Sequence, residues 1–439
     1  MGRKTLAVAA LIAVTALTAT ACTGAAAPKG ESAAEATDLG SVSGTITVLT
    51  HRTDLVQNGT MKKYAAAFNK IYPKVTVKFE GITDYEGEVK IRMNTDNYGD
   101  VLMIPNAIAK KDYPSFFASL GSNAQLSKGY RFTGNTNVGG KVYGLALVGN
   151  ANGFVYNKDV WKKAGITSWP TSTREFVADL KAIKAKTDAV PYYTNFKDQW
   201  PLTAGTASIG SVSCDARAND KLATSTAPWA DGSDLNVIDT LLYDTVHDKL
   251  SEKDPTTTNW ENSKGLIARG EIATMQLGSW AITQMQDAAK TAGKNPDDIG
   301  FMPFPAQKDG KFCAILSSDY QQAVSIHSTH KAAARAWIDW FTEKSGFAQN
   351  EGSIPTARSG ALPDTLKPFE DNGVTLLERS EAKSAQVNTI DNTAEIGLSK
   401  PDYRQKLVDM ARGVQSGGLK DYFADLDKKW SKARKTAGS

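Results

Sequence analysis

Apolar and polar positions along the first part of the chain follow two alternating periods. Residues 44–50 and 74–80 alternate as half-buried strands do, and residues 101–104 form a short apolar run. Between them, residues 61–72 are apolar at 61, 64, 65, 68 and 71, which is one face of a helix, and residues 84–94 are also helical in pattern. This β-α-β-α-β order predicts a parallel sheet covered by helices, with right-handed crossovers.

The same two periods recur as far as the C-terminus. Extended segments are predicted at residues 142–148, 153–156, 271–277 and 312–326, the last one broken near 317–319. Helices are predicted at residues 159–164, 171–186, 234–248, 262–269, 280–292, 331–342, 402–413 and 418–435. Strands that alternate with helices over such a length predict an α/β protein.

Composition narrows the function classes. The 439 residues suffice for two or three domain-sized units, and 51 Lys and Arg against 47 Asp and Glu leave a formal charge of +4. A charge this small argues against nucleic acid as a partner. Three cysteines and four histidines exclude a disulfide-dense scaffold and a four-thiolate zinc site, and we expect no metal site.

The N-terminus has the pattern of a targeting segment. Arg3 and Lys4 precede an apolar stretch at residues 6–19, which is too short for a comfortable bilayer span. Small residues before Cys22 resemble a bacterial lipobox, which predicts cleavage after residue 21 and lipidation of Cys22. The alternative is an ordinary secretory signal that contains a cysteine. Residues 22–43 have the composition of a flexible tether.

Six segments carry a resemblance to a known family. They are ITVLT with MKKYAAAFNKIYPKVTVKFE near the start, GDVLMIP at 99–105, GKVYGLALVGNANGFVYNKDVWKKAGI at 140–166, GEIATMQLGSWAITQM at 270–285, IGFMPFPAQKDGKF at 299–312, and SIPTARSG at 353–360. In order and spacing they resemble the extracellular solute-binding proteins of carbohydrate ABC transporters, the group that contains maltose-binding protein. The resemblance covers about residues 44–439.

The resemblance implies an α/β fold of two lobes, each a sheet flanked by helices, with a ligand cleft and a hinge between them. It implies lobe one from residues 44–150 plus 308–375, and lobe two from residues 151–307 plus 376–439. The lobes would close on a sugar or oligosaccharide by hinge motion, and ABC permease subunits would recognise the closed form. Such a protein is a monomer and not an enzyme, needs no cofactor, and sits on the extracytoplasmic face of the cell membrane through its lipid anchor.

A sugar site needs hydrogen-bonding side chains for the hydroxyls and aromatic rings for the C–H faces. The sequence places such residues at loops after predicted strands and where the chain would cross between lobes: His51, Arg52, Asp54, Asn106, Asn150, Asn152, Asn195, Lys197, Asp198, Trp200, Trp280, Asp319 and Arg358. Trp280 follows LGS, where this family commonly places a stacking aromatic. Trp229 and Trp260 lie in loop-like surroundings that suit either ligand contact or surface packing, whereas Trp337 lies on the apolar stripe of its helix and is expected in the core.

Cys214 and Cys313 remain once the lipidation site is set aside. An oxidising exterior allows them to pair. In the lobe division above they fall in different lobes, so a disulfide would restrict closure unless it lies at the hinge. The sequence leaves this bond open.

Two other function classes are compatible with parts of the pattern. The same fold can bind a polyol, a glycerol phosphodiester, a peptide or a polyamine, although the mixed and Asn-rich candidates favour a neutral polar ligand. A phosphodiester would require Arg52, Lys197 and Arg358 to converge. A secreted polysaccharide hydrolase would require two carboxylates facing each other across a cleft, for which Asp54, Asp198 and Asp319 are available, but the chain has no hydrolase motif.

Overall fold

The predicted β-α-β-α-β unit opens the first sheet of the structure, a computed structural model that describes residues 42–437. β1 pairs in parallel with β2, in register from Gly44 opposite Val75 to Thr50 opposite Gly81, and it pairs in parallel with β3 on its other edge. β13 and β7 extend this sheet with antiparallel pairs. In pairing order the strands are β2 (Val75–Gly81), β1 (Gly44–Thr50), β3 (Val101–Met103), β13 (Gln321–Val324) and β7 (Leu145–Ala146).

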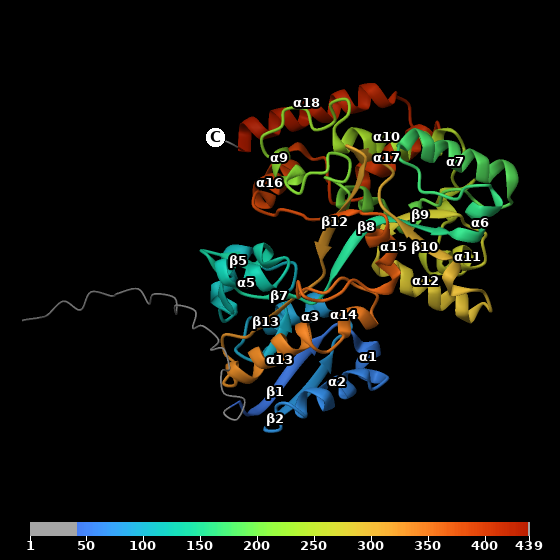
Figure 1. Cartoon of the computed structure of the whole chain (residues 1–439). Helices are drawn as coiled ribbons and strands as arrows, with labels where there is room; N and C mark the ends of the chain where they lie inside the picture. The colour runs from blue at the N-terminus through green and yellow to red at the C-terminus, as the bar shows by residue number, and fades with distance from the viewer. Residues whose placement is uncertain (1–41, 438–439) are drawn as a thin grey trace, which may run out of the picture.

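Amphipathic helices cover the first sheet because each buries one apolar stripe. α2 buries Met61, Tyr64 and Phe68, and α13 buries Trp337, as expected from its position on the stripe. The small sheet β4 (Gly121–Ser122), β6 (Lys141–Val142) and β5 (Asn137–Val138) completes this lobe. Its helices are α1 (Thr53–Gln57), α2 (Thr60–Asn69), α3 (Tyr85–Arg92), α4 (Tyr113–Phe116), α5 (Asn123–Gly129), α13 (Lys331–Glu343) and α14 (Phe347–Asn350). Figure 1 shows this lobe at the bottom.

A second sheet is the centre of the other lobe. β8 lies between β10, β9 and β12, all antiparallel to it, and β14 pairs in parallel with β12. Residues 308–318, which the resemblance assigns to lobe one, therefore take part in the second sheet, because β12 pairs with β8. The strands are β8 (Gly149–Asn157), β9 (Thr274–Gly278), β10 (Ile299–Met302), β11 (Gln307–Lys308), β12 (Lys311–Ser318) and β14 (Thr375–Glu378).

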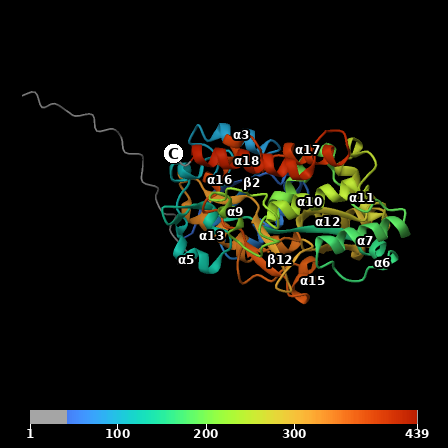
Figure 2. The same cartoon turned by 90° about the horizontal axis from the view of Figure 1, so that it is seen from above.

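Helices from two distant parts of the chain enclose the second sheet. α12 packs against β8 and β10, and α10 packs against α7 and α17. In Figure 1 α18 lies at the top of this lobe, and Figure 2 looks down on α17 and α18. The helices are α6 (Lys158–Lys163), α7 (Thr173–Lys186), α8 (Ala204–Ala207), α9 (Ala218–Leu222), α10 (Asp234–His247), α11 (Trp260–Ala268), α12 (Trp280–Thr291), α15 (Lys367–Asp371), α16 (Ser384–Ala394), α17 (Asp402–Ala411) and α18 (Leu419–Ala437).

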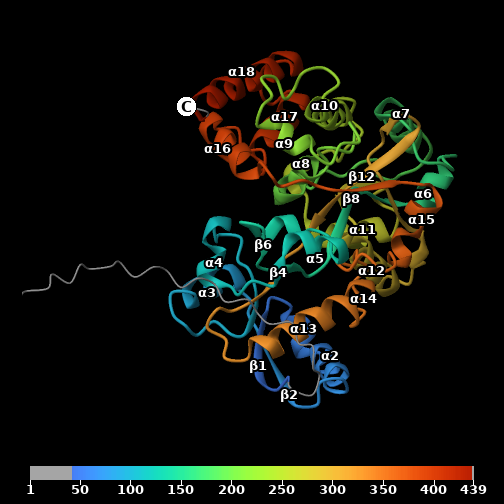
Figure 3. The same cartoon turned by 60° about the vertical axis from the view of Figure 1, so that its left-hand side comes forward.

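The chain passes between the two sheets three times. It leaves β7 for β8, returns from β12 to β13, and leaves α14 for β14. At the first two passages β8 and β12 pair, with Gly149 opposite Ser318 and Asn150 opposite Ser317. Figure 3 shows the two lobes one above the other with these strands between them. A two-lobe α/β fold with short connections is the arrangement that the resemblance implies.

Cys214 and Cys313 form a disulfide, with their Cα atoms 5.3 Å apart. Cys313 lies on β12, and Cys214 lies in the loop before α9. Both positions belong to the structure built around the second sheet, so the bond does not tie the two sheets together. None of the helices between residues 42 and 437 is long and apolar enough to cross a bilayer. Cys22 and residues 22–41 of the predicted tether lie outside the described residues.

Some local predictions differ from the structure. Residues 190–194, whose sequence VPYYT has a strand-like composition, form only isolated bridges, Val190 with Ile272 and Tyr192 with Ser251. Several elements have no counterpart among the predicted ones, among them α5, α9, α16, β10 and β14. β14 is four half-buried residues whose only regular partner is β12, so its strand conformation depends on a contact that local sequence does not encode.

Candidate functional site

A cavity of about 850 Å³ lies where the chain crosses between the two sheets. Its floor comes from the crossing segments: Leu147, Val148, Asn150, Asn152, Ser317, Ser318 and Asp319. One wall comes from the first lobe: His51, Arg52, Asp54, Phe347, Asn350, Glu351 and Ser353. The opposite wall is one helix of the second lobe: Trp280, Thr283, Gln284 and Asp287. A cavity of this size is in the range that holds a ligand larger than a single ring.

The first-lobe wall is organised around Arg52, which follows the end of β1. Its Nη2 and Nε donate to the two carboxylate oxygens of Asp54 at 2.7 and 2.9 Å, and its Nη1 lies 2.5 Å from Glu351 Oε2. Burial by itself lowers the pKa of Arg52, but the hydrogen bonds to Asp54 and Glu351 outweigh it and raise that pKa. The Arg52 hydrogen bond lowers the pKa of Asp54 in turn. This wall therefore presents fixed charges at neutral pH.

His51, in the same wall, lies against Tyr320 and Met103. Its ring centroid is 5.0 Å from that of Tyr320, and its Nδ1 is 3.2 Å from Met103 Sδ. Burial lowers the pKa of His51, and the carboxylate of Asp319 opposes that shift. A neutral imidazole offers a ligand one donor and one acceptor.

Two asparagines and an aspartate stand at the crossings, as the sequence predicts. Asn152 is buried and its Nδ2 donates to the Ile315 carbonyl oxygen at 3.1 Å, so it ties β8 to β12 as well as lining the cavity. Asn150 is half-buried, and Asp319 is exposed, with Oδ1 accepting from the Tyr320 N–H at 2.8 Å. All three line the cavity.

The second-lobe wall is one face of α12. Trp280 is its first residue, half-buried, and Thr283, Gln284 and Asp287 follow at the three-, four- and seven-residue spacing that places side chains on one helix face. Sequence reasoning singled out Trp280 and missed the other three. The helical spacing from Trp280 was the signal that identifies them.

Trp280 belongs to a cluster of three tryptophans. Its ring centroid lies 5.7 Å from that of Trp200 and 5.6 Å from that of Trp260, and those two are 5.1 Å apart. Only Trp280 lines the cavity. Trp200 is 41% exposed and stands beside it.

Three predicted residues near Trp200 make contacts within the protein. Asn195 is buried, with Nδ2 3.3 Å from Met275 Sδ. The backbone N–H of Lys197 donates to Thr258 Oγ1 at 2.9 Å, and Asp198 Oδ2 accepts from the Trp260 N–H at 2.9 Å. None of the three lines the cavity.

Asn106 and Arg358 lie elsewhere. Asn106 borders a second cavity of about 900 Å³, and Glu86 accepts hydrogen bonds from both its backbone N–H and its Nδ2. Arg358 makes an ion pair with Glu378, with Nη1 2.6 Å from Oε1, and its Nε donates to the Ser127 carbonyl oxygen. Both side chains are occupied by protein partners rather than directed to the first cavity.

The two remaining tryptophan candidates pack within the protein. Trp229 is buried, and its Nε1 donates to Asp239 Oδ2 at 2.9 Å, so it is a core residue. Trp260 supports the tryptophan cluster. Asn350 and Glu351 at the end of α14 were missed because their partners are distant in sequence: Glu351 pairs with Arg52, and Asn350 Nδ2 donates to the Tyr64 hydroxyl at 2.9 Å. Over residues 42–437 no group of three or more His, Cys, Asp or Glu is placed to hold a metal ion.

Taken together, the cavity offers fixed hydrogen-bonding groups on one side and an indole ring on the other. The model of the bacterial extracellular solute-binding proteins matches residues 53–346. The chain belongs to this family. Members of the family are binding proteins.

Two curated relatives are named as sugar-binding proteins. The multiple sugar-binding protein of Streptococcus mutans is 25% identical over 329 residues, which is 71% of this chain and 75% of that protein. The melibiose/raffinose/stachyose-binding protein of Bacillus subtilis is 27% identical over 283 residues, which is 61% of this chain and 62% of that protein.

Solved structures show the same two-lobe fold. A manno-oligosaccharide-specific solute-binding protein of Bifidobacterium animalis subsp. lactis, in complex with mannotriose, is 32% identical with a TM-score of 0.79, over 93% of this chain and 99% of that chain. A second ABC-transporter binding protein of the same organism, in complex with mannobiose, is 33% identical with a TM-score of 0.79, over 94% of this chain and all of that chain.

Proposed function

We propose that this protein captures a sugar or oligosaccharide outside the cytoplasm and delivers it to the permease subunits of an ABC importer. The observation that carries the proposal is the cavity between the lobes, where Trp280 faces the polar wall around Arg52. An indole ring suits the C–H face of a sugar, and fixed polar groups suit its hydroxyls. The similarity to proteins solved with mannobiose and mannotriose makes a manno-oligosaccharide the first ligand to test.

Within this proposal the ligand contacts come from His51, Arg52, Asp54, Asn150, Asn152, Trp280 and Asp319 of the earlier candidates, together with Thr283, Gln284, Asp287, Asn350 and Glu351. The two lobes close on the ligand by rotation about the crossings near Gly149 and Ser318. The bodies that move are residues 42–146 with 321–350, and residues 149–318 with 375–437. The protein works as a monomer, without catalysis.

The direct test is calorimetric titration of the mature protein against mannose, mannobiose, mannotriose, maltotriose and raffinose. We expect a dissociation constant in the micromolar range or lower for at least one oligosaccharide. This constant should not change with salt concentration, because the ligand is neutral. Folded protein that binds none of a broad sugar panel would contradict the proposal.

A charged solute is the alternative that this titration separates. A glycerol phosphodiester would gain from several converging cations. Arg52 is held by two carboxylates, Arg358 pairs with Glu378, and Lys197 is outside the cavity, so these three cations do not converge. Binding that weakens steeply with added salt would favour the charged ligand.

Anchoring through Cys22 is a further part of the proposal. A diacylated Cys22 followed by a tether would keep the lobes within reach of the permease. Mass spectrometry of the N-terminal peptide from the native membrane should show a lipid-modified cysteine at residue 22. Release of Cys22→Ser protein into the medium, with wild type retained, is the expected companion result.

A further inference from the structure

Trp200 is a large aromatic side chain left 41% exposed beside the ligand cavity. Within residues 42–437 it is the one tryptophan among the exposed large apolar side chains. Its ring lies against Trp260 at a steep angle of 79° and against Trp280 at 46°. A tryptophan that is packed on its neighbours yet open to solvent next to a cavity needs an explanation beyond core packing.

The segment that carries Trp200 contains no α-helix and no strand. It consists of the two short 3₁₀ turns η3 (Phe196–Asp198) and η4 (Trp200–Thr203). Asn195 and Gln199 have φ of 54° and 65°, in the left-handed region that costs energy for residues other than glycine. Such a conformation persists only where other parts of the molecule hold it.

On its N-terminal side the segment is fastened to α11. The carboxylate of Asp198 accepts the backbone N–H of Trp260, the first residue of that helix, at 2.9 Å. The Lys197 N–H donates to Thr258 Oγ1 at 2.9 Å, just before the helix. One carboxylate therefore fixes the loop of Trp200 to the residue whose ring Trp200 packs against.

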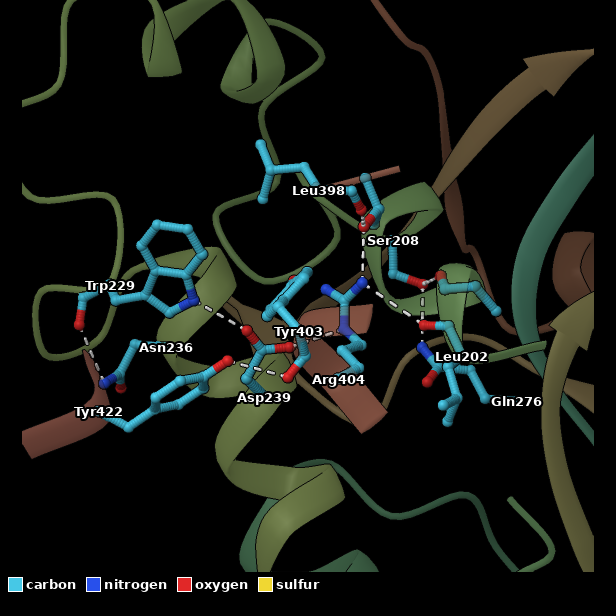
Figure 4. A network of polar contacts seen from close by, with 12 residues as sticks. Leu202, Ser208, Trp229, Asn236, Asp239, Gln276, Leu398, Tyr403, Arg404 and Tyr422 are labelled. Atoms are coloured by element: carbon cyan, nitrogen blue, oxygen red, sulfur yellow. Dashed lines mark hydrogen bonds and ion pairs between the residues drawn. The ribbon is translucent and has the colours of Figure 1, made fainter. Parts of the chain in front are cut away.

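On its C-terminal side the segment is fastened by Arg404 of α17. Its Nη1 donates to Thr206 Oγ1 at 2.6 Å and lies 3.4 Å from the Leu202 carbonyl oxygen, while its Nε pairs with Asp239 at 2.8 Å. Figure 4 shows Arg404 between Asp239 and the backbone at Leu202. Arg404 and Asp239 are almost fully buried, so this anchor is rigid.

Trp260 has a supporting part in the cluster. Lys264 Nζ lies 5.0 Å from the centre of the Trp260 ring, so the lysine covers one face of that indole. Trp280 is already turned to the cavity. Trp200, which is 41% exposed, is therefore the member of the cluster whose ring remains open to solvent, next to the cavity-lining Trp280.

We propose that Trp200 is an outer stacking position that selects for sugar chain length, and that Asp198 is the positioning residue that holds it against Trp260. The proposal rests on the proposed function. A sugar ring at Trp280 lies within the cavity, and the next ring of a linear oligosaccharide continues over Trp200. The ligand class is then an oligosaccharide that extends past the cavity.

The first experiment measures dissociation constants for mannose, mannobiose, mannotriose and mannotetraose with wild type and Trp200→Ala. The substitution should lower affinity roughly tenfold for the sugars long enough to pass Trp280, and less than about twofold for the shorter ones. Trp169→Ala, which removes a half-buried tryptophan that does not line the cavity, should leave every affinity unchanged. Loss by the same factor at every length, or no loss at any length, overturns the proposal.

The second experiment tests Asp198 by rescue. Asp198→Ala should lose the preference for long sugars and change the near-ultraviolet circular dichroism of the coupled indoles, whereas Asp198→Asn keeps an acceptor oxygen and should retain both. A positioning role predicts this pattern even when the melting temperatures of the two variants agree. Retention of the length preference in Asp198→Ala, or its loss in both variants, overturns this role.

The outcomes separate this inference from the proposed function. Folded wild type that binds no sugar of the series or of the wider panel overturns both. Wild type that binds oligosaccharides while Trp200→Ala shows no length-dependent loss overturns the outer stacking position alone.

Discussion

The two walls of the cavity are built by different means. The first-lobe wall is made of short polar segments, in which Arg52 forms ion pairs with Asp54 and Glu351. The second-lobe wall is a single helix face that begins with Trp280 and is backed by two further tryptophans. The first wall depends on ion pairs between side chains from distant segments, and the second depends on local helix geometry and ring packing.

This difference assigns different tasks to the walls. Ring surface gives affinity to any sugar with a suitable C–H face, because stacking does not depend on individual hydroxyls. Polar groups in fixed positions give selectivity, because a wrong sugar leaves them unpaired. The predictions below test whether the walls divide affinity and selectivity in this way.

The largest effect is expected from the aromatic wall. Trp280→Ala should lower the affinity for the best-bound oligosaccharide about a hundredfold, as the loss of a buried aromatic contact does at binding hot spots. Calorimetric titration measures it, with Trp169→Ala as a matched control that should bind normally. A Trp280→Ala protein that is folded and binds within threefold of wild type would show that the aromatic wall is not a ligand contact.

An intermediate effect is expected from the polar wall. Arg52→Met removes the cation that Asp54 and Glu351 share. It should lower affinity by about tenfold, since a charge-assisted hydrogen bond from a partly exposed group contributes roughly 1.5 kcal/mol, the low end of the usual range. The substitution should also reduce the differences in affinity between the sugars of the panel. Arg92→Met, which breaks comparable ion pairs with Glu80 and Glu88 away from the cavity, is the control. Equal losses in both variants would mean that Arg52 acts on stability and not on the ligand.

The smallest effect is a pH dependence at His51. Burial lowers its pKa below the ordinary value of 6.5, so the unfolded chain binds this proton at a higher pH than the folded protein does. The free energy of unfolding should therefore fall as pH decreases below about 6.5, and His51→Gln should lose less over the same interval. Urea unfolding at pH 8.0 and 5.5 measures the difference. The same pH dependence in both proteins would exclude His51 as its source.

Several site residues could be predicted because local sequence places them. The loop 51–54 follows a strand of alternating pattern, Trp280 begins a strong helix, and Asn150, Asn152 and Asp319 stand at breaks between extended segments. The end of a parallel strand and the first turn of a helix are positions that sequence reasoning finds well. Those residues do line the cavity.

The positions of other side chains depend on contacts with segments that are distant in the sequence. Arg358 and Asp198 have the composition of ligand contacts, but Glu378 and the start of α11 are their partners in the structure. Glu351 was missed because Arg52 is its partner across about 300 residues of sequence. A polar residue in a loop has the same local pattern whether it meets a ligand or another part of the protein.

Local sequence patterns were enough to predict the α/β alternation and many of the elements, because apolar periodicity and capping residues act over a few positions. The family was predicted from the resemblance of six segments to known members. Three features became visible in the folded protein alone: residues 308–318 join the second sheet, Cys214 and Cys313 pair within one lobe, and a particular set of polar side chains lines the cavity. These features depend on contacts between segments that are distant in the chain. Such contacts form when the whole core packs, and no local pattern records them.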